Sequence, residues 1–338
     1  MSDRVLIIAA PFGYGPAARA LLLANALADL AAVTLLSSRD AYRFIAQHRA
    51  PPVRCLDGIF SRLYPSREAL AEFDTFISIN NDPAVRHLVA MGLAERSIFV
   101  DSILPWRAEG AAAGFAQPIG AYLVQDFPGA SRLLGACRAQ RVELVAPMVW
   151  PRATAPAARD DEVDGRRIAL HFGGVTSPVV PWDGIRRPIG AMVSLVADLA
   201  RRHRRELTVL GNRHLGSLPL LSDALPGRGI RLVTEANPAE AAALVESAEL
   251  LVTTPGIGMV YEAMAREVPT LLLPPVNSTQ LHQYAVLTGL GYPGSLSEPA
   301  ASALQRQTQG APWDRQSVLA VRWLQANLDE ALAELPSW

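Results

Sequence analysis

The chain has 338 residues, of which 50% are hydrophobic, and a formal net charge of -1. This length favours two domains with packed cores, and the balanced charge provides no basic surface for nucleic acid or anionic membranes. All 31 basic residues are arginines, which excludes a Schiff-base lysine, a pyridoxal anchor and a Walker-type phosphate loop.

Signals for membranes and for oxidising compartments are absent. The amino terminus, MSDRVLIIAAP, enters an apolar run without the basic segment or cleavage site of a signal peptide. No apolar run approaches the ~18 residues that span a membrane. Cys55 and Cys137 are far apart in the sequence, which favours a reducing compartment. We therefore expect a cytoplasmic protein without a membrane span.

Apolar runs of strand length alternate along the chain with amphipathic stretches of helical length. In the first half the runs are 5–10, 33–38, 75–80, 97–102, 121–127 and 142–149. In the second half they are 168–174, 207–212, 230–234, 250–256 and 270–275. Runs that are apolar on both faces are typical of parallel strands covered by helices. The sequence predicts an α/β fold with two doubly wound parallel sheets.

One stretch interrupts this alternation. Residues 151–167, PRATAPAARDDEVDGRR, are rich in Pro, Ala and charge and have no apolar period, so we interpret them as a linker. The predicted domains are then 1–150 and 168–313. Residues 314–335 have the pattern of one long amphipathic helix within a terminal segment, 314–338.

Glycine-rich and polar turns follow several of the second-half runs. Ligands of open α/β sheets bind outside the carboxyl ends of the strands, and glycine amides at a helix start favour phosphate. We expect a nucleotide diphosphate at this rim. The residues expected to contact it are Gly173, Gly174, Gly211, Asn212, Arg213, Pro255, Gly256, Ile257 and Gly258. The alternative is that the glycines only permit sharp turns, and that Glu262 only complements a helix dipole.

The longest of these turns belongs to a more specific pattern, TTPGIGMVYEAMAREVPTLLLPPVNSTQLHQY. It resembles the donor-nucleotide segment of GT-B glycosyltransferases, which include the MurG-type and natural-product UDP-glycosyltransferases. The shared features are a glycine turn, a Glu on the following helix, an apolar strand ending in Pro and a polar loop with Gln. The resemblance implies two Rossmann-like domains that face each other across a nucleotide cleft, with the terminal helix packed on the first domain.

The resemblance also implies residue roles. Glu262 would accept hydrogen bonds from the ribose hydroxyls, in a wet cleft where its loss leaves the fold intact. The glycine turn would lie against the diphosphate. Gln280 and Gln283 would bind the transferred sugar, with His282 between them, although a histidine in such a loop is often only solvated.

The first strand-loop-helix, APFGYGPAARALLLANAL, resembles the acceptor loop of the same family, where a His commonly acts as general base. Here Phe12, Gly13, Tyr14 and Gly15 are followed by Pro16, which cannot take a proton. Three explanations stay open. Another residue supplies the base, the acceptor ionises unaided, or the protein is a helper that has lost catalysis.

Replacement bases would follow strands that end at the cleft. The candidates are Asp126, Asp101 and, less strongly, His171. Each Asp is equally compatible with a helix cap or a turn. Phe12, Tyr14, Trp106 and Phe127 could form acceptor walls or belong to the core.

Other chemistries fit poorly. The sequence has no zinc pattern, no G-x-S-x-G elbow and no D-x-D metal motif, and its G-x-G loop lacks the third glycine of a dinucleotide fingerprint. We therefore expect an inverting, metal-independent transferase without a cofactor, which moves a sugar from a UDP-linked donor to a small soluble acceptor in natural-product biosynthesis. The alternatives are a non-catalytic helper subunit and a nucleotide-sugar epimerase on the same fold. The oligomeric state is left open, with a homodimer as one alternative.

Overall fold

The computed structural model describes residues 3–11, 13–105, 119–137, 139–152, 166–173, 175, 179–222, 229–333 and 335. The chain forms two compact units, Met1–Met148 (unit 1) and Val149–Trp338 (unit 2). Phe12, Trp106, Gly174 and most of the expected linker lie outside the described residues.

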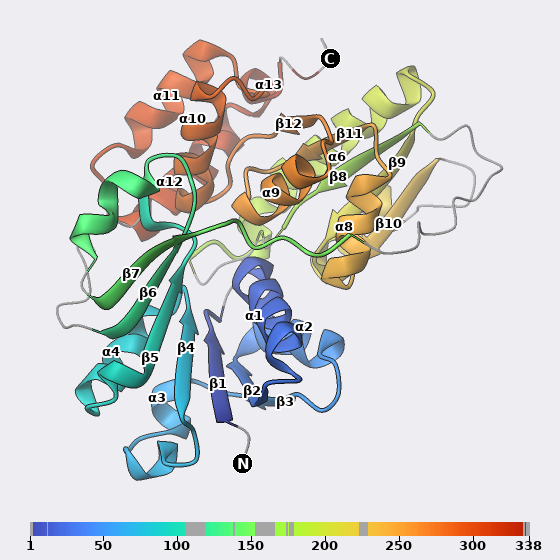
Figure 1. The fold of residues 1–338 in the computed structure, drawn as a ribbon. Helices are drawn as coiled ribbons and strands as arrows, with labels where there is room; N and C mark the ends of the chain where they lie inside the picture. The colour runs from blue at the N-terminus through green and yellow to red at the C-terminus, as the bar shows by residue number, and fades with distance from the viewer. Residues whose placement is uncertain are drawn as a thin grey trace. The chain divides into compact units, whose positions relative to one another are not determined.

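Unit 1 contains a seven-stranded sheet in the order β3-β2-β1-β4-β5-β6-β7, with every neighbouring pair parallel (Figure 1). The strands are β1 Asp3–Ala9, β2 Ala31–Ser37, β3 Arg54–Asp57, β4 Thr75–Ile79, β5 Ser97–Asp101, β6 Ile119–Gln125 and β7 Ala139–Val145. The α-helices are α1 Tyr14–Leu27, α2 Arg39–His48, α3 Phe60–Leu63 and α4 Asp82–Ala90. Short 3-10 turns are η1 Glu68–Leu70, η2 Ala94–Arg96 and η3 Ala130–Ala136.

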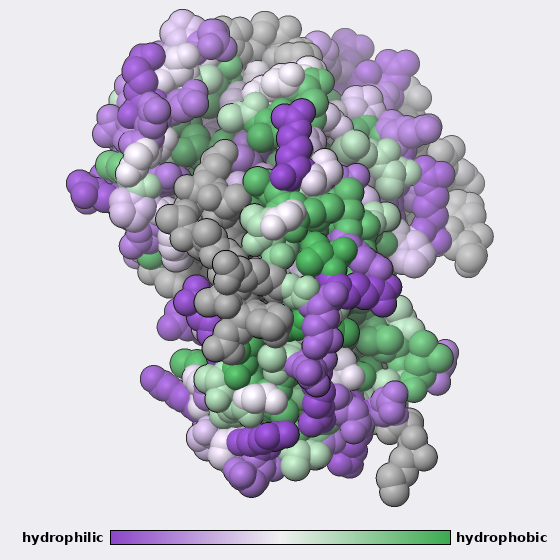
Figure 2. Space-filling model, turned by 60° about the vertical axis from the view of Figure 1, so that its left-hand side comes forward, coloured by the Kyte–Doolittle hydropathy of each residue, from purple (hydrophilic) through white to green (hydrophobic). Residues whose placement is uncertain are grey.

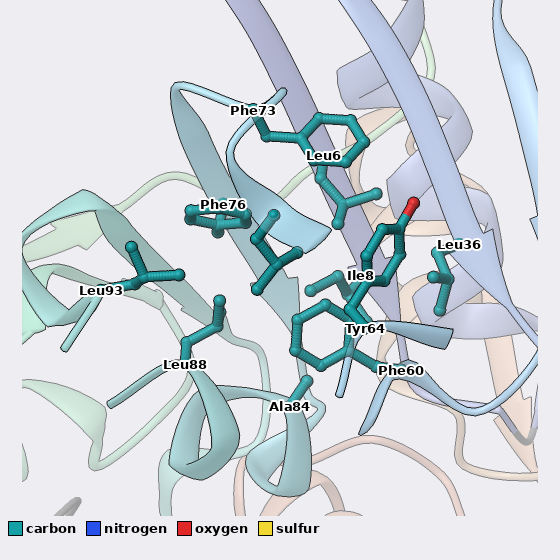
Figure 3. Close-up of a cluster of buried hydrophobic side chains, with 11 residues drawn as sticks. Leu6, Ile8, Leu36, Phe60, Tyr64, Phe73, Phe76, Ala84, Leu88 and Leu93 are labelled. Carbon is teal, nitrogen blue, oxygen red and sulfur yellow. The ribbon is translucent and has the colours of Figure 1, made fainter. Parts of the chain in front are cut away.

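The core of unit 1 explains why its strands are apolar on both faces. Leu6, Ile7 and Ile8 follow one another in β1, and all three are fully buried, so both faces of the sheet are covered. On one face, Leu6 and Ile8 pack with aromatic side chains that include Phe73 and Phe76 (Figure 3). Burial of such a cluster is the main favourable term in folding.

Among the strands in the described residues, β3 alone was missed by the pattern. Its four residues, RCLD, carry a charge at each end, and all four are exposed or only half-buried. Edge strands are often short and charged in this way. An apolar-run criterion cannot detect such a strand.

Unit 2 contains a five-stranded sheet in the order β10-β9-β8-β11-β12, again parallel throughout. The strands are β8 Arg167–His171, β9 Glu206–Gly211, β10 Ile230–Thr234, β11 Leu250–Thr253 and β12 Thr270–Leu272. The helices are α6 Trp182–Arg202, η4 Arg213–Ser217, α7 Pro219–Ser222, α8 Pro238–Glu246, α9 Ile257–Ala265, α10 Ser278–Gly289, α11 Glu298–Thr308, α12 Trp313–Ala326 and α13 Leu328–Ala331. Every predicted run overlaps a strand, and the prediction of two doubly wound parallel sheets is confirmed.

The prediction of one continuous terminal helix is wrong. Helix α12 ends at Ala326, and α13 starts after Asn327. The Asn327 side-chain amide donates to the Trp323 carbonyl at 2.8 Å, and its backbone leaves the helical region at φ -123° and ψ 34°. Asn competes with helix formation through such local bonds. Helix α12 contacts α6, α10 and α11 within unit 2, and its packing on the first domain stays a prediction.

Helix α6 contains Pro188, which has no amide hydrogen to donate to the carbonyl of Gly184, four residues earlier. The structure supplies a substitute from another helix, because the side-chain amide of Gln325 in α12 donates to that carbonyl. The two helices are thereby joined at the point where α6 lacks one of its own hydrogen bonds.

Gln325→Leu is expected to lower the free energy of unfolding by about 1–2 kcal/mol, because it leaves a partly buried carbonyl unpaired. Urea denaturation measures this change. The substitution Pro188→Ala restores a backbone amide that can donate to the Gly184 carbonyl, so Gln325→Leu should cost less in that background. An equal cost in both backgrounds would contradict the assignment.

On the face drawn in Figure 2, hydrophilic residues alternate with hydrophobic patches instead of forming one polar face. Among the helices that the structure describes, none is both long and apolar enough to cross a membrane.

Candidate functional site

The strand order of unit 2 reverses between β8 and β11, which are neighbours in the sheet. Because β8 and β11 are parallel, their carboxyl ends lie at the same edge of the sheet. In the register of this pair, His171 lies opposite Thr253. Loops that diverge from such a point leave a crevice, which is where ligands of open α/β sheets bind. The candidate site in unit 2 is therefore the edge around His171, Thr253 and the first turn of α9.

His171 ends β8 at this edge of the sheet. Its Nδ1 lies 3.2 Å from Thr253 Oγ1 and 3.4 Å from the Gly173 amide nitrogen. Burial lowers the pKa of His171 to about 4. The imidazole is thus neutral at pH 7, and a group this weakly basic is a poor general base.

The lowered pKa predicts a pH dependence of stability. The unfolded chain binds a proton at His171 below its ordinary pKa of about 6.5, while the folded chain binds one only near pH 4. The free energy of unfolding should therefore fall by roughly 1–3 kcal/mol as the pH falls from about 6.5 to about 4. Urea denaturation over this range should show a weaker fall in His171→Asn than in the wild type, whereas the exposed control His203→Asn should behave like the wild type. Equal pH dependence in all three proteins would contradict the assignment.

Two buried glutamines of α10 hold the loops beside α9. Gln283 Oε1 accepts from the Ile257 amide at 3.2 Å, which satisfies one of the unpaired amides at the start of α9. Gln280 Oε1 accepts from the Val276 amide at 2.9 Å, and its Nε2 donates to Thr254 Oγ1 at 3.3 Å. In this structure both side chains bind protein groups, so their sugar-binding role stays a prediction. His282, between them, is half-buried.

Glu262 lies on the second turn of α9, as the pattern predicted, but the expectation that it faces a wet cleft is wrong. The residue is 6% exposed. Its Oε1 accepts from the Trp150 amide at 2.8 Å, and its Oε2 pairs with Nη1 of Arg266. Glu262 and Arg266 are four residues apart, a spacing that places two side chains next to each other on one side of a helix. The ribose role of Glu262 stays a prediction, and the structure adds a structural role.

Arg266 extends this pair into a network. Its Nη2 donates to the Trp150 carbonyl at 3.0 Å, and its Nε lies 3.4 Å from Glu246 on α8. Arg152 joins the same group, with Nη2 bonded to the Ala265 carbonyl at 3.2 Å. Sequence reasoning missed Arg266 and Trp150. The Glu-x-x-x-Arg spacing in α9 could have indicated Arg266, whereas no sequence signal points to Trp150.

Among the remaining rim residues, Gly211 and Asn212 have structural explanations. A Cβ at Gly211 would lie 2.6 Å from Leu215 Cδ1, so the buried Leu215 side chain would have to shift to admit any other residue. Asn212 is buried and its Oδ1 accepts from the His214 amide at 3.1 Å, which caps η4. Arg213 is exposed beside it. The Gly256 backbone has φ -108°, which other residues adopt, and it precedes α9 together with Pro255, while Gly258 lies in its first turn.

In unit 1, the expected bases lie at the carboxyl edge of the sheet but in different surroundings. Asp126 directly follows β6 and is exposed. Asp101 ends β5 and is fully buried; it accepts from Tyr122 Oη at 2.7 Å and from the Ile103 amide at 2.8 Å. Of the two, only Asp126 is accessible to a substrate. Phe127 is buried, in agreement with a core position.

The loop before α1 is shaped by glycine. Gly13 precedes the helix with φ 73°, a conformation that favours glycine. Pro16 is the third helical residue and lies in the turn where amides have no helical partner. Tyr14 stacks on Phe44 of α2 with ring centroids 4.5 Å apart. Gly15 lies above Arg19, because a Cβ there would be 3.2 Å from its Nη1.

A buried polar pair lies behind this loop and was also missed. Arg19 Nε donates to Gln125 Oε1 at 3.1 Å, and the two residues are 5% and 1% exposed. The pair joins α1 to the carboxyl end of β6, one residue before Asp126. Among the residues that the structure describes, no three His, Cys, Asp or Glu side chains are grouped to hold a metal ion.

Comparisons with known proteins extend these observations. A family model described as CGA synthase-related protein matches residues 157–322. Among curated proteins, none matches the chain. Phytolacca americana UGT2, complexed with UDP-2fluoro-glucose and pterostilbene, is 13% identical, with a TM-score of 0.54 over 99% of this chain and 98% of that one.

Other solved structures match over both units as well. A UDP-glucosyltransferase from Polygonum tinctorium, capable of glucosylating indoxyl, has a TM-score of 0.57 and 13% identity, covering 100% of this chain and 98% of that one. The calicheamicin glycosyltransferase CalG4 has a TM-score of 0.53 and 14% identity, covering 98% and 96%. The chain has the GT-B fold. Within GT-B, the switch point between β8 and β11 belongs to the second Rossmann-like unit.

Proposed function

We propose that this chain is a glycosyltransferase that moves a sugar from a nucleotide-sugar, UDP-linked in the first instance, to a small acceptor. The observation that carries the proposal is the switch point of unit 2, where a glycine turn leads into the nine-residue helix α9 at the edge that carries His171 and Thr253. The amino end of a helix at a switch point suits a diphosphate, because its amides and dipole favour negative charge. The solved structures with the same fold, which include complexes with UDP and UDP-sugars, support this choice.

In the proposed reaction, the acceptor attacks the anomeric carbon of the sugar and displaces the nucleoside diphosphate directly, with inversion at that carbon. The developing charge on the leaving diphosphate is stabilised by the amides of the 255–258 turn, as donors fixed in advance lower the cost of charge formation. No metal ion is assigned a role. The acceptor loses its proton to Asp126, the exposed carboxylate at the carboxyl end of β6.

Pro16 motivates the rival proposal of a helper subunit, because it occupies the position at which the GT-B glycosyltransferases that this loop resembles often have their general-base His. The two proposals agree on nucleotide binding and differ on turnover. An epimerase would instead change the sugar of the donor in the absence of any acceptor.

Thermal unfolding in the presence of a panel of nucleoside diphosphates and nucleotide-sugars tests the proposal. A ligand that binds the native state raises the melting temperature by mass action. A shift that depends on the nucleotide, followed by sugar transfer to an acceptor, supports a transferase. A shift without any turnover favours the helper, and a panel without a shift would refute nucleotide binding.

A further inference from the structure

Both main-chain groups of Trp150, at the start of unit 2, bond to side chains of α9 and its carboxyl end. Its amide donates to Glu262 Oε1 at 2.8 Å, and its carbonyl accepts from Arg266 Nη2 at 3.0 Å. Arg152 adds a bond to the Ala265 carbonyl at 3.2 Å and an ion pair with Glu246 at 3.5 Å. We call these contacts the Trp150 clasp.

The clasp uses the Glu262 carboxylate, which the resemblance predicts to bind the ribose of a nucleotide. The Glu262 side chain is 8% exposed, and the Arg266 side chain is 2% exposed. One carboxylate oxygen faces the Trp150 amide and the other faces the Arg266 guanidinium. A ribose presents neighbouring hydroxyl donors, which need an accessible acceptor oxygen. Arg266 balances the charge of the carboxylate whichever donor is present, whereas the Trp150 amide takes an acceptor position of Oε1 on a side chain that is only 8% exposed, which restricts access for a ribose hydroxyl.

We infer that the Trp150 amide and the ribose of a bound nucleotide compete for Glu262, so that nucleotide binding releases segment 150–152 from α9. The inference rests on the proposed nucleotide site. Arg266 is the positioning residue, which holds the carboxylate in place during the exchange. The rival is a permanent clasp, in which Glu262 never contacts a ligand.

Competition has a reciprocal consequence. If nucleotide binding weakens the clasp by some factor, then loss of the clasp strengthens nucleotide binding by the same factor. Both sides of this relation are measurable, one in the affinity of clasp variants and the other in the exchange of the Trp150 amide hydrogen.

Affinity is tested with two substitutions at one position. Trp150→Pro removes the indole and the amide hydrogen, whereas the matched control Trp150→Ala removes only the indole. Competition predicts that Trp150→Pro binds UDP about tenfold more tightly than Trp150→Ala in calorimetry, the scale of a hydrogen bond to a charged group. Equal or weaker binding by a folded Trp150→Pro would overturn the inference.

Hydrogen exchange tests the wild-type protein and does not depend on the proline variant. The Trp150 amide should exchange severalfold faster in saturating UDP than without it. The Glu235 amide, bonded to the Gly211 carbonyl at 2.8 Å, is the control within unit 2 and should not accelerate. Unchanged or slower exchange at Trp150 overturns the inference.

The outcomes separate this inference from the proposed function. If UDP binds and Trp150 exchange does not accelerate, competition fails and the nucleotide site stands. If neither UDP nor any other nucleoside diphosphate binds, the proposed function fails and competition fails with it. The clasp itself is then still measurable, as protection of the Trp150 amide that is lost in Glu262→Ala.

Discussion

Glu262→Ala is expected to lower the free energy of unfolding by about 3 kcal/mol, because removing one partner of a buried ion pair costs roughly 3–5 kcal/mol. The substitution leaves the Arg266 guanidinium, with a side chain that is 2% exposed, without its nearest countercharge. Arg266 keeps the Trp150 carbonyl and the more exposed Glu246, which places the expected loss at the lower end of that range. Urea denaturation of both proteins measures the difference.

Two controls identify the cause. Asp198→Ala breaks an ion pair whose partners are 70% and 55% exposed, so it should cost at most about 1 kcal/mol. The double variant Glu262→Ala/Arg266→Met removes both buried charges and should recover much of the lost stability. If the double variant is less stable than Glu262→Ala alone, the destabilisation does not come from the stranded arginine.

Asp126→Asn is expected to reduce sugar transfer by about 10²–10⁴-fold, the usual contribution of a positioned general base. The amide keeps the size of the carboxylate and cannot take a proton. Because Asp126 is exposed and lies in unit 1, the stability of the protein and its affinity for the donor nucleotide should stay close to wild type. Initial rates at saturating donor, together with calorimetry for UDP, measure the two properties.

Asp101→Asn is the matched control on the neighbouring strand β5. Its carboxylate is fully buried and bonded to Tyr122 and to the Ile103 amide, so the substitution should change stability more than turnover. If Asp126→Asn transfers sugar at the wild-type rate, the acceptor ionises unaided or another group takes its proton.

Much of the fold could be predicted because the deciding interactions are local or averaged over a run. Residues such as Leu6, Ile7 and Ile8 mark a strand covered on both faces, whatever their partners are. Prediction failed where a short, charged segment or a single contact determines the presence or the end of an element. Strand β3 is too short and charged to have a pattern, and Asn327 ends α12 through one side-chain bond.

Some features of the candidate site could likewise be recognised in the sequence, and others could not. The glycine turn and Glu262 are close in sequence, so their spacing could be recognised before the structure was known. The surroundings of Glu262 could not, because the amide that it binds belongs to Trp150, 112 residues away. His171 likewise meets Thr253 across 82 residues. Pairings over such distances are set by the topology of the sheet and leave no local trace in the sequence.

The bond between Gln325 and Gly184 has a consequence for the order in which the protein is made. The two residues are 141 positions apart, so α6 leaves the ribosome long before the helix that completes its hydrogen bonding. The Ser278 amide likewise donates to Ser317 Oγ, 39 positions later, so this bond also cannot form until α12 has been translated. Unit 1 has all its strands before β8 is translated and can fold first, as amino-terminal domains generally do. The hydrogen bonding of unit 2 is complete only after α12 has been translated. A chain truncated before α12 would therefore have a folded unit 1 and an incompletely bonded unit 2.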